Sequence, residues 1–204
     1  MRVALFAIID YGAGNVPSVE RALQKLAVDS RRVTQPAELD HANAIILPGV
    51  GHYAAIIRAL DQHNLRSALL SAIKNGIPFL GICLGLQALY ASSEEAPAVP
   101  GLNLLRGSVC SLPRSVKLPH MGWNRLRVRR PSTLLNGLSE ADYFYFAHTF
   151  AAATETPEVV ATCDHGVNFT AVIEHKNIYA TQFHPEKSAA AGARLLQNFV
   201  SLVR

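Results

Sequence analysis

Cys83 has a sequence environment that could make its thiol a nucleophile. It is the centre of a G-x-C-x-G pattern, between an apolar run typical of a buried strand and a run typical of a helix. This is the pattern of a nucleophile elbow, in which flanking glycines relieve crowding at a tight strand-to-helix turn. Backbone N–H groups and the helix dipole favour a thiolate there. On its own, however, Cys83 would be better interpreted as a small buried hydrophobic residue.

His184 and Glu186 supply the base and the acidic partner that such a thiol needs. They belong to the run Gln-Phe-His-Pro-Glu at residues 182–186, which follows an apolar strand pattern. An imidazole can take the thiol proton and later return it to a leaving amine, while a carboxylate fixes its tautomer and orientation. A lone histidine at a strand end is more often structural. Because the elbow accompanies it, we predict a catalytic triad of Cys83, His184 and Glu186.

A glycine loop follows another predicted strand, at residues 48–52. Gly49 and Gly51 flank Val50 in this loop. Two glycines let the backbone approach a substrate and present N–H groups, which an oxyanion hole requires. An ordinary glycine turn would have the same spacing, so the oxyanion-hole interpretation of this loop depends on the presence of the elbow. The carboxyl ends of neighbouring parallel strands meet at one edge of a sheet, so we expect the loop and the elbow to lie together.

Other candidate sites are weaker. Gly12 and Gly14 follow a strand, but no third glycine completes the dinucleotide-binding spacing, which favours a tight turn. His148 could compete with His184 as the base, although a structural strand histidine is the better interpretation. The remaining histidines show no ligand spacing, and the three cysteines form no C-x-x-C pair. We assign no metal and no cofactor.

The elements that must position these residues alternate between strand and helix over the first ninety residues, which predicts a parallel sheet covered on both faces. Strands are predicted at residues 3–9, 30–34, 44–47 and 77–82, and later at 143–150, 159–162, 169–174 and 177–183. Helices are predicted from Asn15, which can cap a helix with Pro17 in its first turn, and at residues 65–74 and 189–203. Prolines and glycines after Ser92 predict short hairpin-like segments.

The composition predicts a single domain over residues 1–204 in the cytoplasm. Half of the 204 residues are hydrophobic, enough for a sizeable core. The first apolar stretch is too short for a signal peptide or a membrane span, and an odd number of cysteines fits a reducing compartment. The net charge is +4, and the one dense basic stretch, residues 125–130, alternates as a half-exposed strand would. No nucleic-acid module accompanies it, which leaves docking to an acidic partner or a phosphorylated substrate open.

The elbow, the glycine loop and the His-Pro-Glu run, in this order, resemble the class I (triad) glutamine amidotransferases. The resemblance implies a three-layer α/β/α sandwich of flavodoxin-like type around a mixed, mostly parallel sheet. It also implies hydrolysis of L-glutamine to glutamate and ammonia by Cys83, His184 and Glu186. It leaves the acceptor of the ammonia open.

Four stretches, at residues 9–15, 48–52, 119–124 and 182–188, are similar to the glutaminase subunits of imidazole glycerol phosphate synthase. These subunits work in histidine biosynthesis and supply ammonia to a separate barrel-shaped cyclase of the HisF type. The cyclase makes imidazole glycerol phosphate and an aminoimidazole carboxamide ribotide. The resemblance therefore implies a heterodimer with such a cyclase, and no nucleic-acid or membrane partner. It also implies that binding of the acceptor to the cyclase activates glutamine hydrolysis. One route for this activation is a turn of a peptide in the glycine loop.

The resemblance assigns further residues by position. The glutamine and oxyanion site would take in Gly49, Val50, Gly51, Leu84, Gln87 and the backbone of Thr149 and Phe150. The cyclase interface or ammonia exit would take in Asn15, Trp123, Tyr143 and Lys187. His165 and Phe150 stand where the family usually has tyrosines, so details near them are open.

Three alternatives share parts of this evidence. A glutaminase for another acceptor, such as pyridoxal phosphate synthase, keeps the triad, but residues 119–124 weigh against it. A non-catalytic regulatory subunit of the same fold is disfavoured by the complete triad. A cysteine peptidase is disfavoured by Gln87 and the partner-facing stretches.

Overall fold

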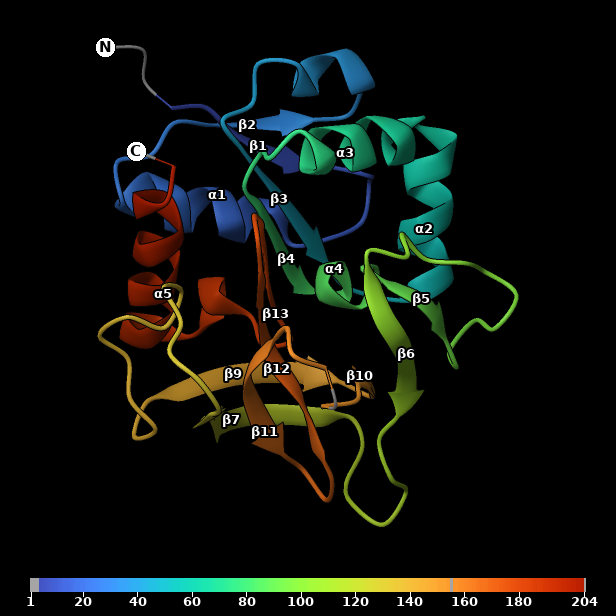
Figure 1. Ribbon diagram of the computed structural model, residues 1–204, viewed down its shortest axis with the longest axis vertical. Helices are drawn as coiled ribbons and strands as arrows, with labels where there is room; N and C mark the ends of the chain where they lie inside the picture. The colour runs from blue at the N-terminus through green and yellow to red at the C-terminus, as the bar shows by residue number, and fades with distance from the viewer. Residues whose placement is uncertain (1–3, 155, 204) are drawn as a thin grey trace.

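The computed structural model describes residues 4–154 and 156–203, which form one central sheet, two smaller sheets and flanking helices (Figure 1). The strands are β1 (Phe6–Ile9), β2 (Ser30–Val33), β3 (Ala44–Gly49), β4 (Phe79–Cys83), β5 (Tyr90–Ser93), β6 (Leu105–Ser111), β7 (His120–Arg125), β8 (Arg127–Val128), β9 (Tyr143–His148), β10 (Phe150–Ala152), β11 (Val159–Asp164), β12 (Asn168–His175) and β13 (Ile178–Thr181). The helices are α1 (Val16–Lys25), α2 (Tyr53–Gln62), α3 (Leu65–Lys74), α4 (Leu84–Gln87) and α5 (Ala189–Ser201), with short 3₁₀ turns η1 (Pro36–Leu39) and η2 (Pro185–Lys187).

The central sheet has the order β2-β1-β3-β4-β13-β12-β11-β8. The pairs from β2 to β13 are parallel, and the pairs from β13 to β8 are antiparallel. The predicted mixed, mostly parallel sheet is therefore confirmed. The parallel half has the strand order of flavodoxin-like folds.

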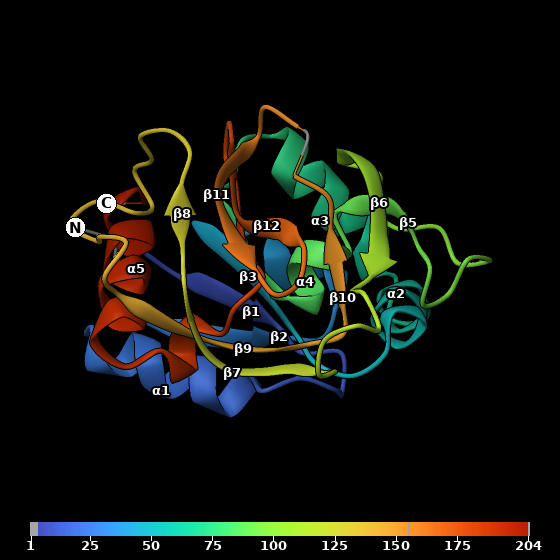
Figure 2. The same cartoon turned by 90° about the horizontal axis from the view of Figure 1, so that it is seen from below.

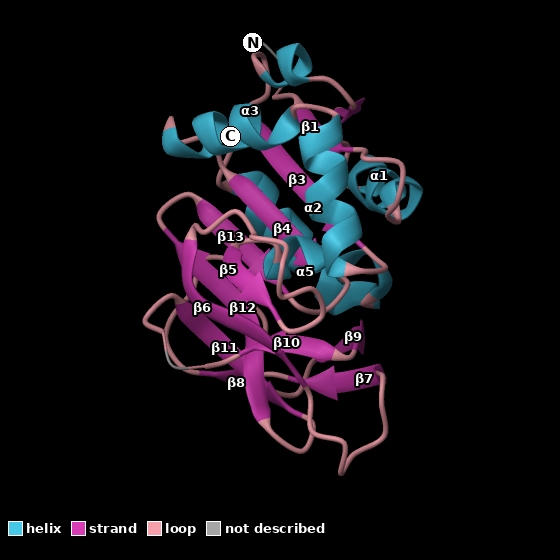
Figure 3. Cartoon of the chain, turned by 90° about the vertical axis from the view of Figure 1, so that its right-hand side faces the viewer, coloured by secondary structure: helices cyan, strands magenta, loops and turns pink. Residues whose placement is uncertain are grey.

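Helices cover both faces of this sheet, and the alternation of side chains along β1 shows how. Phe6 and Ile8 are buried in one apolar cluster with the inner faces of α1 and α5. Ala7 and Ile9 are buried in a second cluster with α2 and α3. Figure 3 shows the helices gathered around the parallel strands in the upper part of the view. Burial on both faces explains why these strands are continuous apolar runs, and the predicted three-layer α/β/α sandwich is confirmed.

The two smaller sheets lie toward the end of the molecule that is away from α3 and β2 (Figure 1). Their orders are β10-β6-β5 and β7-β9. Seen from below, β7 and β9 run side by side across the bottom of the molecule (Figure 2). The hairpins predicted after Ser92 do not form in these two sheets, because β5 and β6 pair in parallel and the antiparallel pairs β6–β10 and β7–β9 join strands that are not consecutive. The two sheets close the end of the central sheet where β3, β4 and β13 finish.

Several element predictions need correction. Helix α2 was not predicted, and its N-cap, His52, accepts a hydrogen bond from the Ala54 N–H, which ends the glycine loop with a helix. The predicted strand at residues 143–150 is two strands in different sheets, because the chain turns at Thr149. The first strand begins at Phe6, and the predicted residue Val3 lies outside the described residues. The Asn15 side chain makes no capping hydrogen bond, although Asn15 is the N-cap of α1 and Pro17 lies in its first turn.

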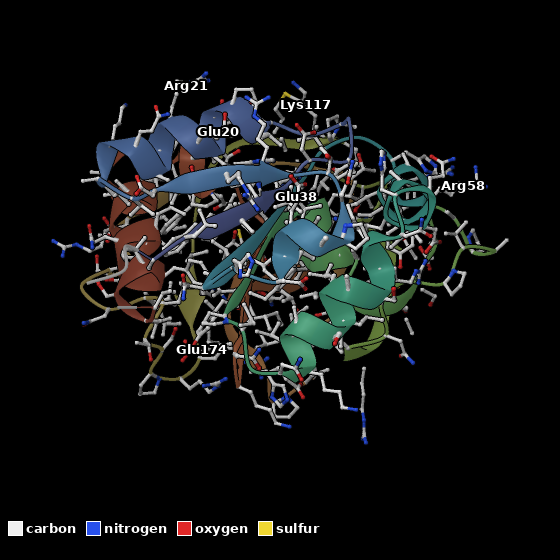
Figure 4. The ribbon with its side chains drawn as sticks, turned by 90° about the horizontal axis from the view of Figure 1, so that it is seen from above. Glu20, Arg21, Glu38, Arg58, Lys117 and Glu174 are labelled. Atoms are coloured by element: carbon white, nitrogen blue, oxygen red, sulfur yellow. The ribbon has the colours of Figure 1, made fainter. Side chains whose placement is uncertain are left out.

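The basic residues are dispersed, as the sequence predicts. Figure 4 shows Arg21 on α1, Arg58 on α2 and Lys117 well apart at the edge of the molecule. The dense stretch at residues 125–130 is not one strand, because Arg125 ends β7 and only Arg127 and Val128 form β8. Among the described residues, no helix is both long and apolar enough to cross a bilayer.

Candidate active site

Cys83 ends β4 in a strained conformation, and its buried side chain lines a cavity at the end of the sheet. Its φ is 55° and its ψ is −105°, a combination that non-glycine residues rarely adopt. Gly85 makes the turn possible, since a Cβ there would collide with the Leu47 carbonyl oxygen of β3. Helix α4, only four residues long, begins directly after Cys83. This geometry is a nucleophile elbow.

His184 and Glu186 lie just beyond β13, the strand that pairs with β4 on the side away from β3. The His184 Nδ1 lies 2.9 Å from Glu186 Oε1, and both side chains are almost completely buried. The His184 N–H donates to the Tyr145 carbonyl, and its own carbonyl accepts from the Ser188 hydroxyl. With Nδ1 directed at Glu186, the other ring nitrogen, Nε2, is left to face the thiol.

The electrostatics of His184 favour its charged form. Burial lowers the pKa of His184, but the neighbouring Cys83 thiolate and Glu186 carboxylate outweigh burial and raise it to about 10. A protonated imidazole beside a thiolate is a nucleophile paired with a proton donor. The structure thus brings the three predicted triad residues together at one edge of the sheet, with Cys83 and His184 lining one cavity and Glu186 hydrogen-bonded to His184.

A cavity of about 250 Å³ opens over Cys83 and His184. It takes in most of the residues assigned to glutamine or the oxyanion: Val50, Gly51, Leu84, Gln87, Thr149 and Phe150. Gly49 and Glu186 do not line it: Gly49 packs against the start of α4, and Glu186 lies behind His184. A cavity of this size suits a small substrate rather than a polypeptide segment.

Gln182 is a site residue that the sequence reasoning quoted but gave no role. Its side-chain nitrogen lies 3.6 Å from Cys83 Sγ, and its side-chain oxygen accepts from Gln87 at 3.1 Å. The Gln87 nitrogen also donates to the Phe150 carbonyl at 2.7 Å. These hydrogen bonds hold the pocket residue Gln87 in place relative to Cys83. The sequence signal that could have identified Gln182 is its position two residues before His184.

Glu95 is a second residue that was missed. It lines the cavity, and its carboxylate accepts from the Tyr53 N–H at 2.7 Å. A carboxylate in such a cavity is suited to bind a cationic group such as an ammonium. The only sequence signal for Glu95 is that it is a charged residue in a proline-containing segment, and this signal is too weak to assign a role.

The glycine loop lies beside the elbow as predicted, because Gly49 pairs with Cys83 across β3 and β4. The two glycines differ in their surroundings. A Cβ on Gly49 would lie 2.6 Å from the Leu84 Cβ, whereas a Cβ on Gly51 would meet no atom within 4 Å. Gly51 has φ +97°, and the Val50 side chain is 36% exposed. The start of the loop is packed, and its end is open.

His148 lines the cavity but is not suited to replace His184. Its Nδ1 lies 3.0 Å from the Phe150 carbonyl oxygen, and its Nε2 lies 3.1 Å from His120 Nδ1. Burial lowers its pKa to about 3. Both ring nitrogens of His148 are occupied, which supports a structural role.

His165 stands where the family usually has a tyrosine. It stacks on His120 with ring centroids 4.2 Å apart and does not line the cavity, so this departure from the family pattern lies outside the pocket wall.

An exposed apolar face adjoins the cavity on the β7-β9 sheet. Trp123 is 53% exposed and Tyr143 is 50% exposed, while Met121 is more exposed still and also lines the cavity. Lys187 lines the cavity too, with its Nζ 5.8 Å from the centre of the Tyr145 ring. Asn15 is half-buried at the start of α1. A cluster of large exposed apolar side chains is typical of a protein interface.

No metal-binding group of three or more ligands occurs among the residues described.

Comparison with known proteins places this geometry in a family. The profile "Glutamine amidotransferase class-I" matches residues 7–202. The chain is 48% identical to "Imidazole glycerol phosphate synthase subunit HisH" of Methanothermobacter thermautotrophicus, over 98% of this chain and all of the relative. It is 44% identical to the protein of the same name from Moorella thermoacetica, over 97% of this chain and 95% of the relative.

Solved structures support the fold independently. "Structure of PurLQS from Thermotoga maritima" aligns with a TM-score of 0.79 and 20% identity, covering all of both chains. "Crystal structure of glutamine amidotransferase" aligns with a TM-score of 0.77 and 20% identity, covering 97% of this chain and 98% of the other. Similarity at this level of identity concerns the fold alone.

Proposed function

The chain belongs to the class-I glutamine amidotransferases, as a HisH-type glutaminase subunit of imidazole glycerol phosphate synthase, and we propose that Cys83, His184 and Glu186 are its catalytic triad. The observation that carries this proposal is the position of His184, which is hydrogen-bonded to Glu186 and lines one cavity with Cys83. Residues 1–204 act as one glutamine amidotransferase domain.

The first half-reaction breaks the side-chain amide of L-glutamine. The Cys83 thiolate attacks the amide carbon, and a tetrahedral oxyanion forms. His184 gives its proton to the amide nitrogen, the C–N bond breaks, and ammonia leaves a glutamyl thioester on Cys83.

The second half-reaction returns the enzyme to its starting state. Neutral His184 takes a proton from water, and the hydroxide attacks the thioester carbon. The C–S bond breaks, glutamate leaves, and the thiolate again faces a protonated imidazole. Glu186 stays ionised and holds the imidazole throughout.

Backbone N–H groups from the Val50–Gly51 segment and from Leu84 stabilise the oxyanion. Leu84 is the first residue of α4, so its N–H is not used within the helix. Such donors matter because negative charge develops on the oxygen only in the transition state.

The remaining pocket residues bind the amino-acid end of glutamine. Glu95 pairs with the α-ammonium group, because one carboxylate can accept from Tyr53 and from the substrate together. Gln87 and the backbone of Thr149 and Phe150 fix the rest of the molecule. The absence of a tyrosine hydroxyl at Phe150 is tolerated, because Phe150 offers its backbone.

The ammonia passes to a separate cyclase subunit, a HisF-type barrel, in a heterodimer. That subunit makes imidazole glycerol phosphate and aminoimidazole carboxamide ribotide. Trp123 and Tyr143 face it, and Met121 lies on the same face while lining the cavity, which gives ammonia a short route. Asn15 and Lys187 complete the interface or the exit. A dry route keeps ammonia unprotonated and nucleophilic. Free cysteines and a role in amino-acid biosynthesis support a cytoplasmic location.

The test measures glutamate release by the purified chain alone, with its cyclase, and with the cyclase and its ribotide substrate. We expect the full mixture to raise kcat by about 10²-fold, the value of one oxyanion-hole donor. The Cys83→Ala chain, mixed in the same way, is the control and should release no glutamate. Equal rates in all three wild-type mixtures would contradict the coupling to a cyclase.

A further inference from the structure

The sheet sets the position of Gln182. Strand β13 pairs in parallel with β4, with Thr181 opposite Ile82, so Gln182 comes beside Cys83 where both strands end. The backbone N–H of Gln182 donates to the Ala171 carbonyl of β12 at 2.9 Å, and the residue is fully buried. The strand pairing therefore holds a buried side-chain amide next to the nucleophile.

The hydrogen bonds of Gln87 determine which end of the Gln182 amide faces the sulfur. The Phe150 carbonyl can only accept, so the Gln87 atom 2.7 Å from it is the amide nitrogen. That nitrogen also lies 3.1 Å from the Gln182 side chain, which must present its oxygen there. The nitrogen of Gln182 is then the atom 3.6 Å from Cys83 Sγ, and it is a donor.

A donor in this place favours the thiolate form of Cys83 over the thiol. A thiolate is a charged acceptor, and hydrogen bonds to charged groups are stronger than those between neutral groups. The Ala147 carbonyl oxygen, 4.0 Å from Sγ, can only accept and therefore favours the thiol. The Gln182 amide offsets the effect of this carbonyl.

Gln182 differs from the ionisable groups around Cys83 because its amide does not titrate. The ionisable groups that line the cavity with Cys83 are Glu95, His148, His184 and Lys187, while Tyr11 and Glu186 are buried nearby without lining it. In the proposed reaction His184 gives a proton to the amide nitrogen and later takes one from water. The Gln182 N–H can donate to the sulfur before and after each of these transfers.

We propose that Gln182 is a catalytic residue that donates a side-chain N–H to the Cys83 thiolate and increases the fraction of the thiol that is ionised. This inference rests on the proposed glutaminase function and adds a neutral donor to the triad. The same amide holds Gln87 through its oxygen, so its two ends have two roles. The roles can be separated, because only the first acts on Cys83 when glutamine is absent.

The experiment measures the pH dependence of Cys83 alkylation by iodoacetamide without glutamine, in Gln182→Met and in Gln87→Met. Methionine has nearly the length of glutamine but neither its donor nor its acceptor. We expect Gln182→Met to move the alkylation profile about one unit to higher pH, a tenfold loss of rate on its acid side, the worth of one hydrogen bond. Gln87→Met should raise KM for glutamine in the cyclase complex and leave the alkylation profile as in wild type.

Thr181→Val is the control for loss of a buried polar group beside Gln182. The Thr181 hydroxyl donates to the Phe183 carbonyl at 3.0 Å, and Thr181 does not line the cavity. This variant should match wild type in both the alkylation profile and KM. If Gln182→Met does not fold, Gln182→Glu replaces it: this variant keeps an acceptor for Gln87, loses the donor to Cys83, and should move the profile in the same direction.

The proposal is overturned if the alkylation profile of the Gln182 variant matches that of wild type. It is also overturned if Gln87→Met moves the profile as far, because Gln182 would then act only by holding Gln87, or if Thr181→Val does so. The alkylation assay does not depend on hydrolysis, so it tests Gln182 separately from the proposed function. Absence of glutaminase activity in the wild-type complex would contradict the proposed function instead.

Discussion

The catalytic triad and the glycine loop lie at the same edge of the sheet but are built differently. The triad side chains are buried, and His184 is fixed through its ring, its N–H and its carbonyl. The loop is packed only at Gly49, while Gly51 is open and Val50 is 36% exposed.

The difference indicates which part of the site is preorganised and which part is adjustable. A nucleophile and its base gain from a fixed, buried arrangement because their charges are strengthened there. An oxyanion hole made from a glycine loop can be assembled when it is needed. Hydrolysis can therefore be regulated at the loop without disturbing the thiolate.

The largest expected effect is at the fixed part. Cys83→Ala should lower glutamine hydrolysis by a factor of about 10⁴ or more, since no other thiol lines the cavity. Synthesis from added ammonia in the complex should continue at the wild-type rate, because the fold and the interface are unchanged. Measuring both activities on one preparation checks the prediction; loss of both would mean that Cys83 is needed for the structure.

Glu186→Gln tests the charge of His184 and should lower kcat by about 10²- to 10⁴-fold, as loss of a triad carboxylate does. The carboxylate helps raise the pKa of His184, so its loss should move the alkaline limb of the pH–rate profile to lower pH. An alkaline limb at the wild-type position would contradict this role of Glu186.

The same variant changes how stability depends on pH. Because the pKa of His184 is raised in the folded state, its contribution is complete below the unfolded value of about 6.5 and is lost as pH rises toward the folded value. Wild type should therefore lose more unfolding free energy than Glu186→Gln between these two values. Chemical denaturation over this alkaline range measures the difference.

The two loop glycines should respond unequally to alanine. Gly49→Ala pushes a methyl group into Leu84 and should lower both stability and kcat, the latter by about 10-fold or more, because it shifts the elbow. Gly51→Ala meets no neighbour but carries backbone strain of about 1 kcal/mol at its positive φ, so it should mainly reduce stimulation by the cyclase. Equal losses in basal kcat for the two variants would remove the distinction between a packed start and an open end.

The smallest effect is expected from Val50→Ala. The Val50 side chain is partly exposed and its proposed contribution comes from its N–H, so kcat and stability should stay within about threefold and 0.5 kcal/mol of wild type. Steady-state kinetics and thermal unfolding check both values. A drop beyond tenfold would assign a role to the side chain instead of the backbone.

The sequence predicts the fixed part of the site better than the adjustable part. The elbow around Cys83 and the run at His184 have strong local patterns, because a tight turn needs glycines and a buried parallel strand needs a continuous apolar run. The alternation of strand and helix in the first half is visible for the same reason.

What the sequence does not predict depends on contacts between distant segments. Glu95 enters the pocket because β5 and its following segment fold back beside α2, where the Tyr53 N–H binds it. The break at Thr149 arises because Phe150 pairs with Ser111 of β6, whereas His148 pairs with His120 of β7.

The most direct test of a fixed triad beside an adjustable loop is the pH dependence of Cys83 alkylation by iodoacetamide, with and without the cyclase and its ribotide substrate. Cys83→Ala measured in parallel subtracts reaction at the other two cysteines. We predict that the alkylation profile stays the same while glutaminase kcat rises by about 10²-fold. An alkylation profile that moves to lower pH in step with the rise in kcat would show that the nucleophile, rather than the loop, is what the partner adjusts.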